Sequence, residues 1–190
     1  MPTPNTDKRI ENLRKANDES HRVIVESLRE ALYRLLETRD IRDIKVVDLI
    51  RKAGVSRGAF YKNYYLVTDV LADDIRAITE DVSAAMGTDI VLNWHVILRT
   101  VHHHRDKIPL LLKAGMGMEM LGQINRSIDT MRDEEQALRV MAWNGVIFNC
   151  IQYWAVRGFV DDPDELVESM AAITMPLFDG AVSNADGNGA

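Results

Sequence analysis

The residues best suited to chemistry in this chain lie between Arg57 and Asn63, and the chemistry they suit is nucleic-acid binding. The stretch reads Arg-Gly-Ala-Phe-Tyr-Lys-Asn, which combines two cations, a phenol and an amide with two residues of minimal bulk. Cations and hydroxyls bond phosphate oxygens, and arginine or lysine also bonds the edge of guanine. An exposed helix of this composition is therefore suited to entry into the major groove of DNA.

The residues before this stretch predict a short helix followed by a tight turn. Apolar side chains at Ile44, Val47, Ile50 and Ala53 recur at every third position, which predicts one inward helical face. Gly54 follows the last of them, at a position where a left-handed backbone conformation costs glycine little. The sequence therefore predicts a helix that ends at Ala53 and turns at Gly54.

A second short helix is predicted to begin after Ser56, whose hydroxyl can accept a bond from a backbone N–H as the N-cap. Phe60 and Tyr64 stand four residues apart, so both can face inward from the same side of this helix. The remaining side chains are then expected to face outward: Arg57, Gly58, Ala59, Tyr61, Lys62 and Asn63.

Together these segments resemble the DNA-binding signature of the tetracycline-repressor (TetR) family. The resemblance lies in Ala53–Gly58, in Phe60–Tyr64 and in the following Asp69–Leu71. Members of that family are dimeric bacterial transcriptional regulators, usually repressors released by a small ligand. The resemblance implies an all-α, nine-helix TetR-like fold, with a three-helix DNA-binding domain followed by a helical ligand-binding and dimerisation domain. It also implies a double-stranded, palindromic operator as partner.

The resemblance and the outward positions together predict the DNA-binding residues. Lys45 stands where the family often has a threonine or serine cap, so another group is expected to cap the first short helix. Tyr65 stands where the family commonly has a lysine on phosphate, although a tyrosine hydroxyl can also bond a phosphate oxygen. The full predicted set is Lys45, Ser56, Arg57, Gly58, Ala59, Tyr61, Lys62, Asn63 and Tyr65.

The charge of the chain is unevenly distributed, and its distribution matters more than its sum of −6. Residues 1–65 hold 14 Lys and Arg against 10 Asp and Glu, a balance of +4, and the remainder holds 9 against 19, a balance of −10. Residues 42–65 alone hold six cations and two acids. This asymmetry favours an oriented approach to DNA, although a solvated helical surface can also carry such an excess.

Composition places the chain among cytoplasmic globular proteins. A hydrophobic content of 46% is enough for a core, and no run of about 18 uncharged apolar residues predicts a membrane span. The first residues lack the cationic and apolar pattern of a secretion signal. A single cysteine, Cys150, excludes an internal disulfide and fits a reducing compartment. We expect that thiol to be buried and inert, because its helix is apolar.

The pattern of helix signals predicts four regions along the chain. Residues 1–16 are expected to form a flexible arm, 17–66 the DNA-binding domain, 67–178 the regulatory and dimerisation domain, and 179–190 a disordered tail. Helices are predicted over 68–86, from Asp89 to the histidines at 102–104, over 106–114, over 118–131, over 133–157 and from Pro163 onward.

The second domain contains aromatic and methionine side chains that suit a ligand cavity, since methionine packs adaptably around varied ligands. Such side chains are also ordinary core residues, and for Trp143 and Phe148 the sequence does not separate a pocket from a subunit seam. If the domain binds a ligand, we expect a small apolar or aromatic one. The predicted pocket residues are Trp94, His95, Met116, Met120, Trp143 and Phe148.

The helix over residues 133–157 is apolar over much of its circumference, so it must be covered on more than one side. The residues that end it and open the next helix also resemble the last two helices of some TetR-family members, which form a four-helix dimer interface. The homodimer residues predicted on this basis are Asn149, Tyr153, Leu166, Met170 and Ile173.

Other chemistries have less support. The histidines at 102–104 are adjacent, so their side chains point in different directions and cannot converge on one metal ion. The chain has no nucleophile elbow and no phosphate-binding glycine loop, so we expect neither an enzyme nor a cofactor. Two alternatives stay open: a DNA-binding regulator controlled by a protein partner, and a small helical enzyme or carrier built on a DNA-binding scaffold.

Overall fold

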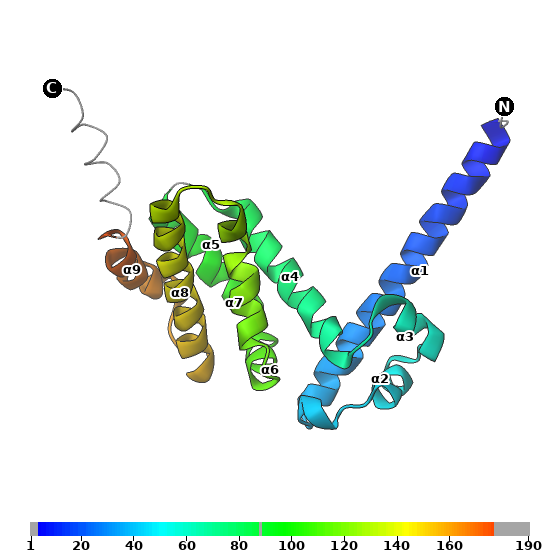
Figure 1. Cartoon of the computed structure of the whole chain (residues 1–190). Helices are drawn as coiled ribbons and strands as arrows, with labels where there is room; N and C mark the ends of the chain where they lie inside the picture. The colour runs from blue at the N-terminus through cyan, green and yellow to red at the C-terminus, as the bar shows by residue number, and fades with distance from the viewer. Residues whose placement is uncertain (1–3, 88, 177–190) are drawn as a thin grey trace. The chain divides into compact units, whose positions relative to one another are not determined.

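The computed structural model describes residues 4–87 and 89–176, and every regular element in these ranges is helical. The chain forms two compact units, Met1–Leu71 and Ala72–Ala190 (Figure 1). The boundary falls after Leu71, where the sequence predicted it after residue 66. Within the described ranges, no helix combines the length and the apolar character needed to cross a bilayer. The predicted tail over 179–190 lies outside the described residues.

The first unit begins with a long helix, α1 (Pro4–Leu36), and the predicted flexible arm over residues 1–16 is wrong from Pro4 onward. Its first half is stabilised within the helix, because Lys15 pairs with Glu11 and the Ser20 hydroxyl donates to the Ala16 carbonyl. Pairs spaced by three or four residues stabilise a helix without burial. Residues 4–16 of the predicted arm therefore belong to a helix.

The second half of α1 carries the core of the first unit. Leu28, Leu32 and Leu36 are fully or almost fully buried, at helical spacing. A short 3-10 turn, η1 (Ile41–Asp43), follows, and then α2 (Val46–Ala53) packs against α1. The third helix of the unit is α3 (Arg57–Asn63). The predicted three-helix arrangement with a tight turn between its last two helices is therefore present.

The inward face of α2 differs from the predicted one. Val47 is 51% exposed, whereas Leu49 is fully buried. The prediction counted Ile44 as the first helical position, but Ile44 has an extended backbone before the helix begins. The face that turns inward starts instead at Val46 and follows positions i, i+3, i+4 and i+7, through Leu49, Ile50 and Ala53.

The second unit contains the remaining helices. The helix α4 (Val67–Ala85) begins before the unit boundary and continues beyond it. It is followed by α5 (Ile90–His103), α6 (Ile108–Lys113), α7 (Gly117–Asn125), the 3-10 turn η2 (Arg126–Thr130), α8 (Glu134–Val156) and α9 (Pro163–Thr174). Asp89, Asp133 and Asp162 cap α5, α8 and α9 through their carboxylates. The sequence predicted that these helices begin at Asp89, at residue 133 and at Pro163.

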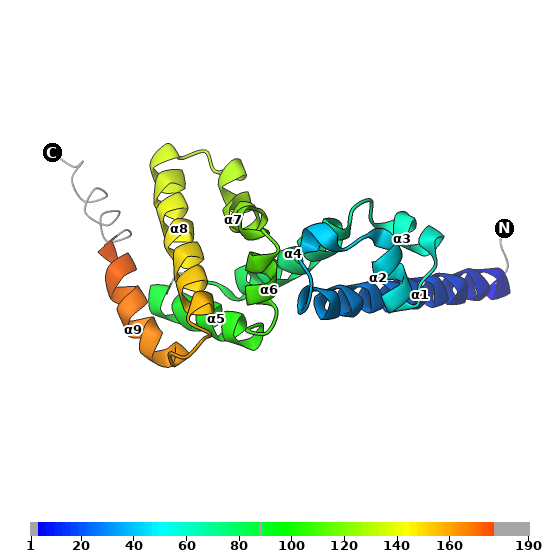
Figure 2. The same ribbon diagram turned by 90° about the horizontal axis from the view of Figure 1, so that it is seen from below.

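Two helix pairs organise the second unit. The helices α5 and α9 are in extensive contact, and the indole N–H of Trp94 donates to the Thr174 hydroxyl across them at 2.9 Å. The helices α7 and α8 lie side by side in both views (Figures 1 and 2). Trp94 of α5 and Trp143 of α8 meet edge to face, with ring centroids 5.0 Å apart. The core of the unit therefore contains an aromatic pair between α5 and α8.

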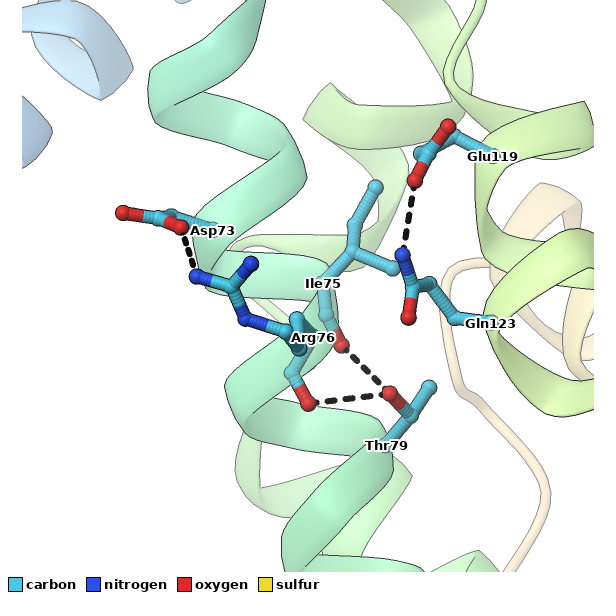
Figure 3. A network of polar contacts seen from close by, with 6 residues as sticks. All are labelled: Asp73, Ile75, Arg76, Thr79, Glu119 and Gln123. Carbon is cyan, nitrogen blue, oxygen red and sulfur yellow. Dashed lines mark hydrogen bonds and ion pairs between the residues drawn. The ribbon is translucent and has the colours of Figure 1, made fainter. Parts of the chain in front are cut away.

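The helix α4 shows how polar and apolar faces are separated in this unit. Figure 3 shows the Ile75 side chain directed toward Glu119 and Gln123 of α7, and Ile75 is 1% exposed. Two polar contacts of α4 stay within the helix, because Arg76 pairs with Asp73 and the Thr79 hydroxyl donates to the carbonyls of Ile75 and Arg76. A third reaches outside it, because the buried Asp74 pairs with Lys107 at 3.3 Å. The apolar face is thus left free for packing.

The helix predicted over residues 118–131 is shorter than expected, because α7 ends at Asn125 and continues only as a 3-10 turn. The Asn144 side chain of α8 donates to the Ile124 carbonyl and to the Asn125 side chain, each at 3.1 Å. This buried amide satisfies a carbonyl at the end of α7. A side chain twenty residues away in sequence therefore marks the end of this α-helix.

Candidate nucleic-acid interface

The turn between α2 and α3 has the geometry that its sequence predicted. Gly54 has a left-handed backbone with φ of 69°, and the N–H groups of Gly54 and Val55 both donate to the Ile50 carbonyl. The Ser56 hydroxyl then accepts a bond from the Ala59 N–H at 3.1 Å. The C-terminal end of α2 and the N-terminal end of α3 are therefore both capped, which defines the angle between the two helices.

The inner side of α3 is anchored by aromatic side chains. Phe60 is fully buried and Tyr64 is 5% exposed, as predicted, and their ring centroids lie 6.1 Å apart. Tyr64 ends the helix with an extended backbone. Because both anchors lie on one side, the opposite side of α3 is presented to solvent on a rigid support.

The outer side of α3 presents two cations that form no ion pair within the described part of the chain. Arg57 and Lys62 are both exposed. The guanidinium of Arg57 lies over the ring of Tyr61, with its carbon 5.6 Å from the ring centroid. Both charges, and the phenol between them in sequence, are therefore available to an external partner.

Other predicted DNA-binding residues lie on α3 or at the start of α2. Gly58 is exposed, Ala59 is half-buried, and the Asn63 amide donates to the Ala59 carbonyl at 2.7 Å. That bond uses one of the two N–H donors of the Asn63 amide. Lys45 is exposed at the N-cap of α2 and its side chain makes no capping bond.

The loop between α3 and α4 depends on a residue whose role the sequence analysis missed. The Asp69 carboxylate accepts bonds from the backbone N–H groups of Tyr65 and Leu66, each at 2.8 Å. This contact holds the loop while the Tyr65 side chain stays 82% exposed. An aspartate in the first turn of a helix was the available indication, because its carboxylate can satisfy N–H groups that precede the helix.

A second cationic surface of the first unit is a groove of about 410 Å³ between α1 and α2. It is lined by Leu35, Arg39, Asp48, Arg51 and Lys52. Asp48 pairs with Arg39 at 3.7 Å and with Arg51 at 3.9 Å. These two arginines are partly neutralised within the protein, unlike the cations of α3.

The residues predicted for a ligand pocket lie in the second unit and most of them are buried. Trp94, Met120, Trp143 and Phe148 are each less than 10% exposed. Met116 and His95 are half-buried, and Nδ1 of His95 lies 3.3 Å from the Asp164 carboxylate. The structure thus brings aromatic and thioether side chains of α5, α7 and α8 into the interior of one unit, and their role toward a ligand stays a prediction.

The residues predicted for a dimer interface include an exposed apolar set. Tyr153 of α8 and Ile173 of α9 are 62% and 59% exposed, and Leu166 and Met170 are half-buried. Asn149 is exposed and its amide donates to the carbonyl of Gly145. The sequence analysis missed Val156, which is 86% exposed, although it lies in the apolar stretch that made α8 a candidate.

Several titratable side chains of the second unit are packed against other residues of the unit. His102 stacks on Trp154, and burial lowers the pKa of His104, with His103 and Lys107 adding to the effect. The described residues contain no group of three side chains placed to hold a metal ion. Cys150 is buried, as predicted, and burial raises the pKa of its thiol to about 11.

Comparison with known proteins adds a loose structural likeness. No protein-family model matches the chain, and no curated protein matches it in sequence. The chain is similar to a solved structure, the TetR family repressor AlkX from Dietzia sp. strain DQ12-45-1b, implicated in biodegradation of n-alkanes. The likeness covers 80% of this chain and 93% of that chain, with a TM-score of 0.43 and 16% identity. Both values are low, so this likeness alone does not indicate the function of the chain.

Proposed function

We propose that this chain is a dimeric, sequence-specific DNA-binding regulator of transcription of the TetR type. Each subunit inserts α3 into the major groove of one half of a palindromic operator. The observation that carries the proposal is the construction of α3. Its inner side is fixed by Phe60, and its outer side presents Arg57 and Lys62, which form no ion pair with any residue of the described ranges. A helix that presents unpaired cations and small residues from a rigid turn is the arrangement that a major groove accepts.

The residues of α3 divide between base contacts and phosphate contacts. Arg57 and Lys62 bond a guanine edge or a phosphate, and Gly58 and Ala59 allow close approach, with the Ala59 methyl near a thymine methyl. Phosphates accept bonds from the hydroxyl of Tyr61 and from groups around Ser56. Lys45, Asn63 and Tyr65 complete the contact surface at its edges.

The dimer uses the outer sides of α8 and α9. Tyr153 and Val156 of α8 and Ile173 of α9 are large apolar side chains exposed in the single chain, and exposed apolar side chains favour association with another protein. A second copy of the same surface is the proposed partner, because a palindromic operator requires two-fold symmetry. Asn149, Leu166 and Met170 contribute to the same interface.

Release from DNA follows the binding of a small apolar or aromatic ligand within the second unit. The support is the buried set around the Trp94–Trp143 pair, to which Met120 and Phe148 add polarisable side chains. A ligand changes operator affinity only through its different affinities for the DNA-competent and DNA-incompetent states. A Trp154→Phe variant leaves Trp94 and Trp143 as the two tryptophans. We expect binding of the ligand to change the fluorescence of these two tryptophans. If no class of metabolite changes it, control by a protein partner is favoured.

Selection of bound duplexes from a random library, at a stated salt concentration, tests the DNA-binding proposal. We expect enrichment of an inverted repeat whose half-sites are separated by one or more turns of the duplex. Recovery of a library with the composition of the input would contradict the proposal. Sedimentation of the free protein then tests the dimer separately, with a mass twice that of one chain as the expected result.

A further inference from the structure

We infer that Tyr61 is a positioning residue for Arg57, and that the aromatic ring at this position determines how strongly each subunit prefers guanine at one base pair of its half-site. The inference rests on the proposed function, since it specifies how the outer side of α3 reads a base. It concerns the ring of Tyr61, whereas the phosphate contact proposed above uses the hydroxyl.

The first support is a continuous series of contacts from the core to the guanidinium. Phe60 is fully buried, and the Tyr61 ring meets it edge to face, with centroids 5.2 Å apart and planes at 84°. The guanidinium carbon of Arg57 lies 5.6 Å from the centroid of the Tyr61 ring. Residues four apart on a helix lie on the same side, so Tyr61 connects an exposed cation to a fixed part of the unit.

The second support is that a ring contact does not use the N–H donors of the Arg57 guanidinium. An aromatic ring attracts a cation through its π face and, unlike a carboxylate, has no oxygen to accept the five N–H donors of arginine. Arg42 shows the contrast, because its Nε and one terminal nitrogen both donate to Asp40 at 2.9 Å. A carboxylate partner of that kind occupies the in-plane donors. Tyr61 orients Arg57 without occupying the fork that bonds O6 and N7 of guanine.

The third support is the position of Arg57 in the helix. Arg57 is the first residue of α3, where the partial positive charge of the helix end is unfavourable for a cation. No carboxylate of the described residues pairs with it, so the helix end gives its side chain no electrostatic anchor. The negative face of the Tyr61 ring, one turn further along, supplies an attraction that holds the cation against α3.

The test compares Tyr61→Phe, which keeps the ring and removes the hydroxyl, with Tyr61→Leu, which removes both. Each full-length variant is titrated with the duplex selected by the wild-type protein and with duplexes in which single guanines of both half-sites are replaced. Tyr61→Leu is expected to reduce the preference for guanine at one position by about two- to fivefold per half-site, the value of an exposed cation–π contact. Tyr61→Phe is expected to keep the preference even if its overall affinity falls.

An Arg57→Ala background provides the coupling control. If the two side chains act together, Tyr61→Leu has no further effect on base preference once Arg57 is replaced. The inference is overturned if Tyr61→Leu keeps the wild-type preference, or if Tyr61→Phe loses as much as Tyr61→Leu. These results differ from failure of the proposed function, in which the wild-type protein itself selects no duplex.

A measurement without DNA tests the contact directly. In the NMR spectrum of the free protein, the δ-protons of Arg57 should be shifted upfield by the ring in the wild type and in Tyr61→Phe, and unshifted in Tyr61→Leu. Unshifted protons in the wild type would overturn the inference even if the protein selects DNA. If the wild type selects no duplex, the base preference fails together with the proposed function, and the shift still decides the ring contact.

Discussion

The outer sides of α3 and α8 present opposite chemistry, although both helices bury aromatic side chains on their inner sides. On α3 the exposed cations Arg57 and Lys62 have no ion pair within the described residues. On α8 the exposed side is apolar at Tyr153 and Val156. The surface of α3 thus carries positive charge that no described carboxylate neutralises, and the surface of α8 exposes apolar side chains to solvent.

The arginines in α8 and at its C-terminal end reinforce this contrast. Arg139 pairs with Glu135 at 2.7 Å, and Arg157 pairs with Asp161 at 3.4 Å. These two cations are thus neutralised within the protein, whereas those of α3 have no ion pair with any described residue. Unpaired cations favour a polyanion, whereas an apolar surface with neutralised charges favours another protein chain.

The largest expected effect concerns the inner anchor that makes α3 a rigid support. Phe60→Ala should lower the free energy of unfolding by about 3–5 kcal/mol, because a fully buried aromatic side chain is lost. Tyr61→Ala, its exposed neighbour, should cost about 1 kcal/mol or less. Denaturant unfolding of the full chain checks both values. Equal losses would show that α3 is not anchored through Phe60.

The apolar side of α8 is tested by placing a charge on it. Val156→Glu should raise the dissociation constant of the dimer by about 100-fold, because a carboxylate without a partner would be buried at the interface. Val23→Glu places the same charge at an exposed apolar position of α1 and should leave the dimer unchanged. Sedimentation equilibrium measures both constants. An unchanged Val156→Glu dimer would mean that this side of α8 does not form the interface.

The buried thiol of Cys150, on the inner side of α8, should make the free energy of unfolding depend on pH. The thiol of Cys150 has a pKa of about 11 in the folded chain against an ordinary value of 9.0, so between these values the unfolded chain has lost a proton that the folded chain retains. Stability from this group is therefore complete below about pH 9 and falls as pH rises, by about 1–2 kcal/mol. Denaturant unfolding of the wild type and of Cys150→Ala at increasing pH checks the difference. Parallel curves would contradict the burial of the thiol.

Removing a helix cap should have a smaller effect on stability, and comparing two caps distinguishes a loss of stability from a loss of DNA binding. Ser56→Ala should lower the free energy of unfolding by about 1 kcal/mol through the loss of the α3 cap, and should also weaken operator binding. Asp133→Ala removes the corresponding cap of α8, where the carboxylate accepts a bond from the Gln136 N–H at 3.0 Å. It should cost a similar amount of stability and leave operator affinity unchanged. Equal losses of affinity in both variants would show a general effect of stability.

The parts of the structure that local chemistry determines were predictable from the sequence. The left-handed Gly54, the Ser56 cap and the inward Phe60 and Tyr64 follow from residue type and spacing within a dozen residues. The caps at Asp89 and Asp133 follow in the same way. In each case the deciding atoms belong to the same turn or to an adjacent one.

The parts that distant contacts determine were not predictable. The end of α7 depends on Asn144, a side chain of α8. The bond between Trp94 and Thr174 joins residues 80 positions apart. The inward face of α2 was missed for a different reason, because the period of three ran through Ile44, which lies before the helix.

Operator binding by an Arg57→Ala/Lys62→Ala variant is the most direct test of the claim that the outer side of α3 contacts DNA. Its matched control is Arg126→Ala/Arg132→Ala, which removes the same charge from exposed positions of the second unit. Measured at one salt concentration on the selected duplex, the first variant should lose about 1–3 kcal/mol of binding free energy per base-reading residue. The control should bind as the wild type does. Equal affinities of the two variants would contradict the assignment of α3 to the major groove.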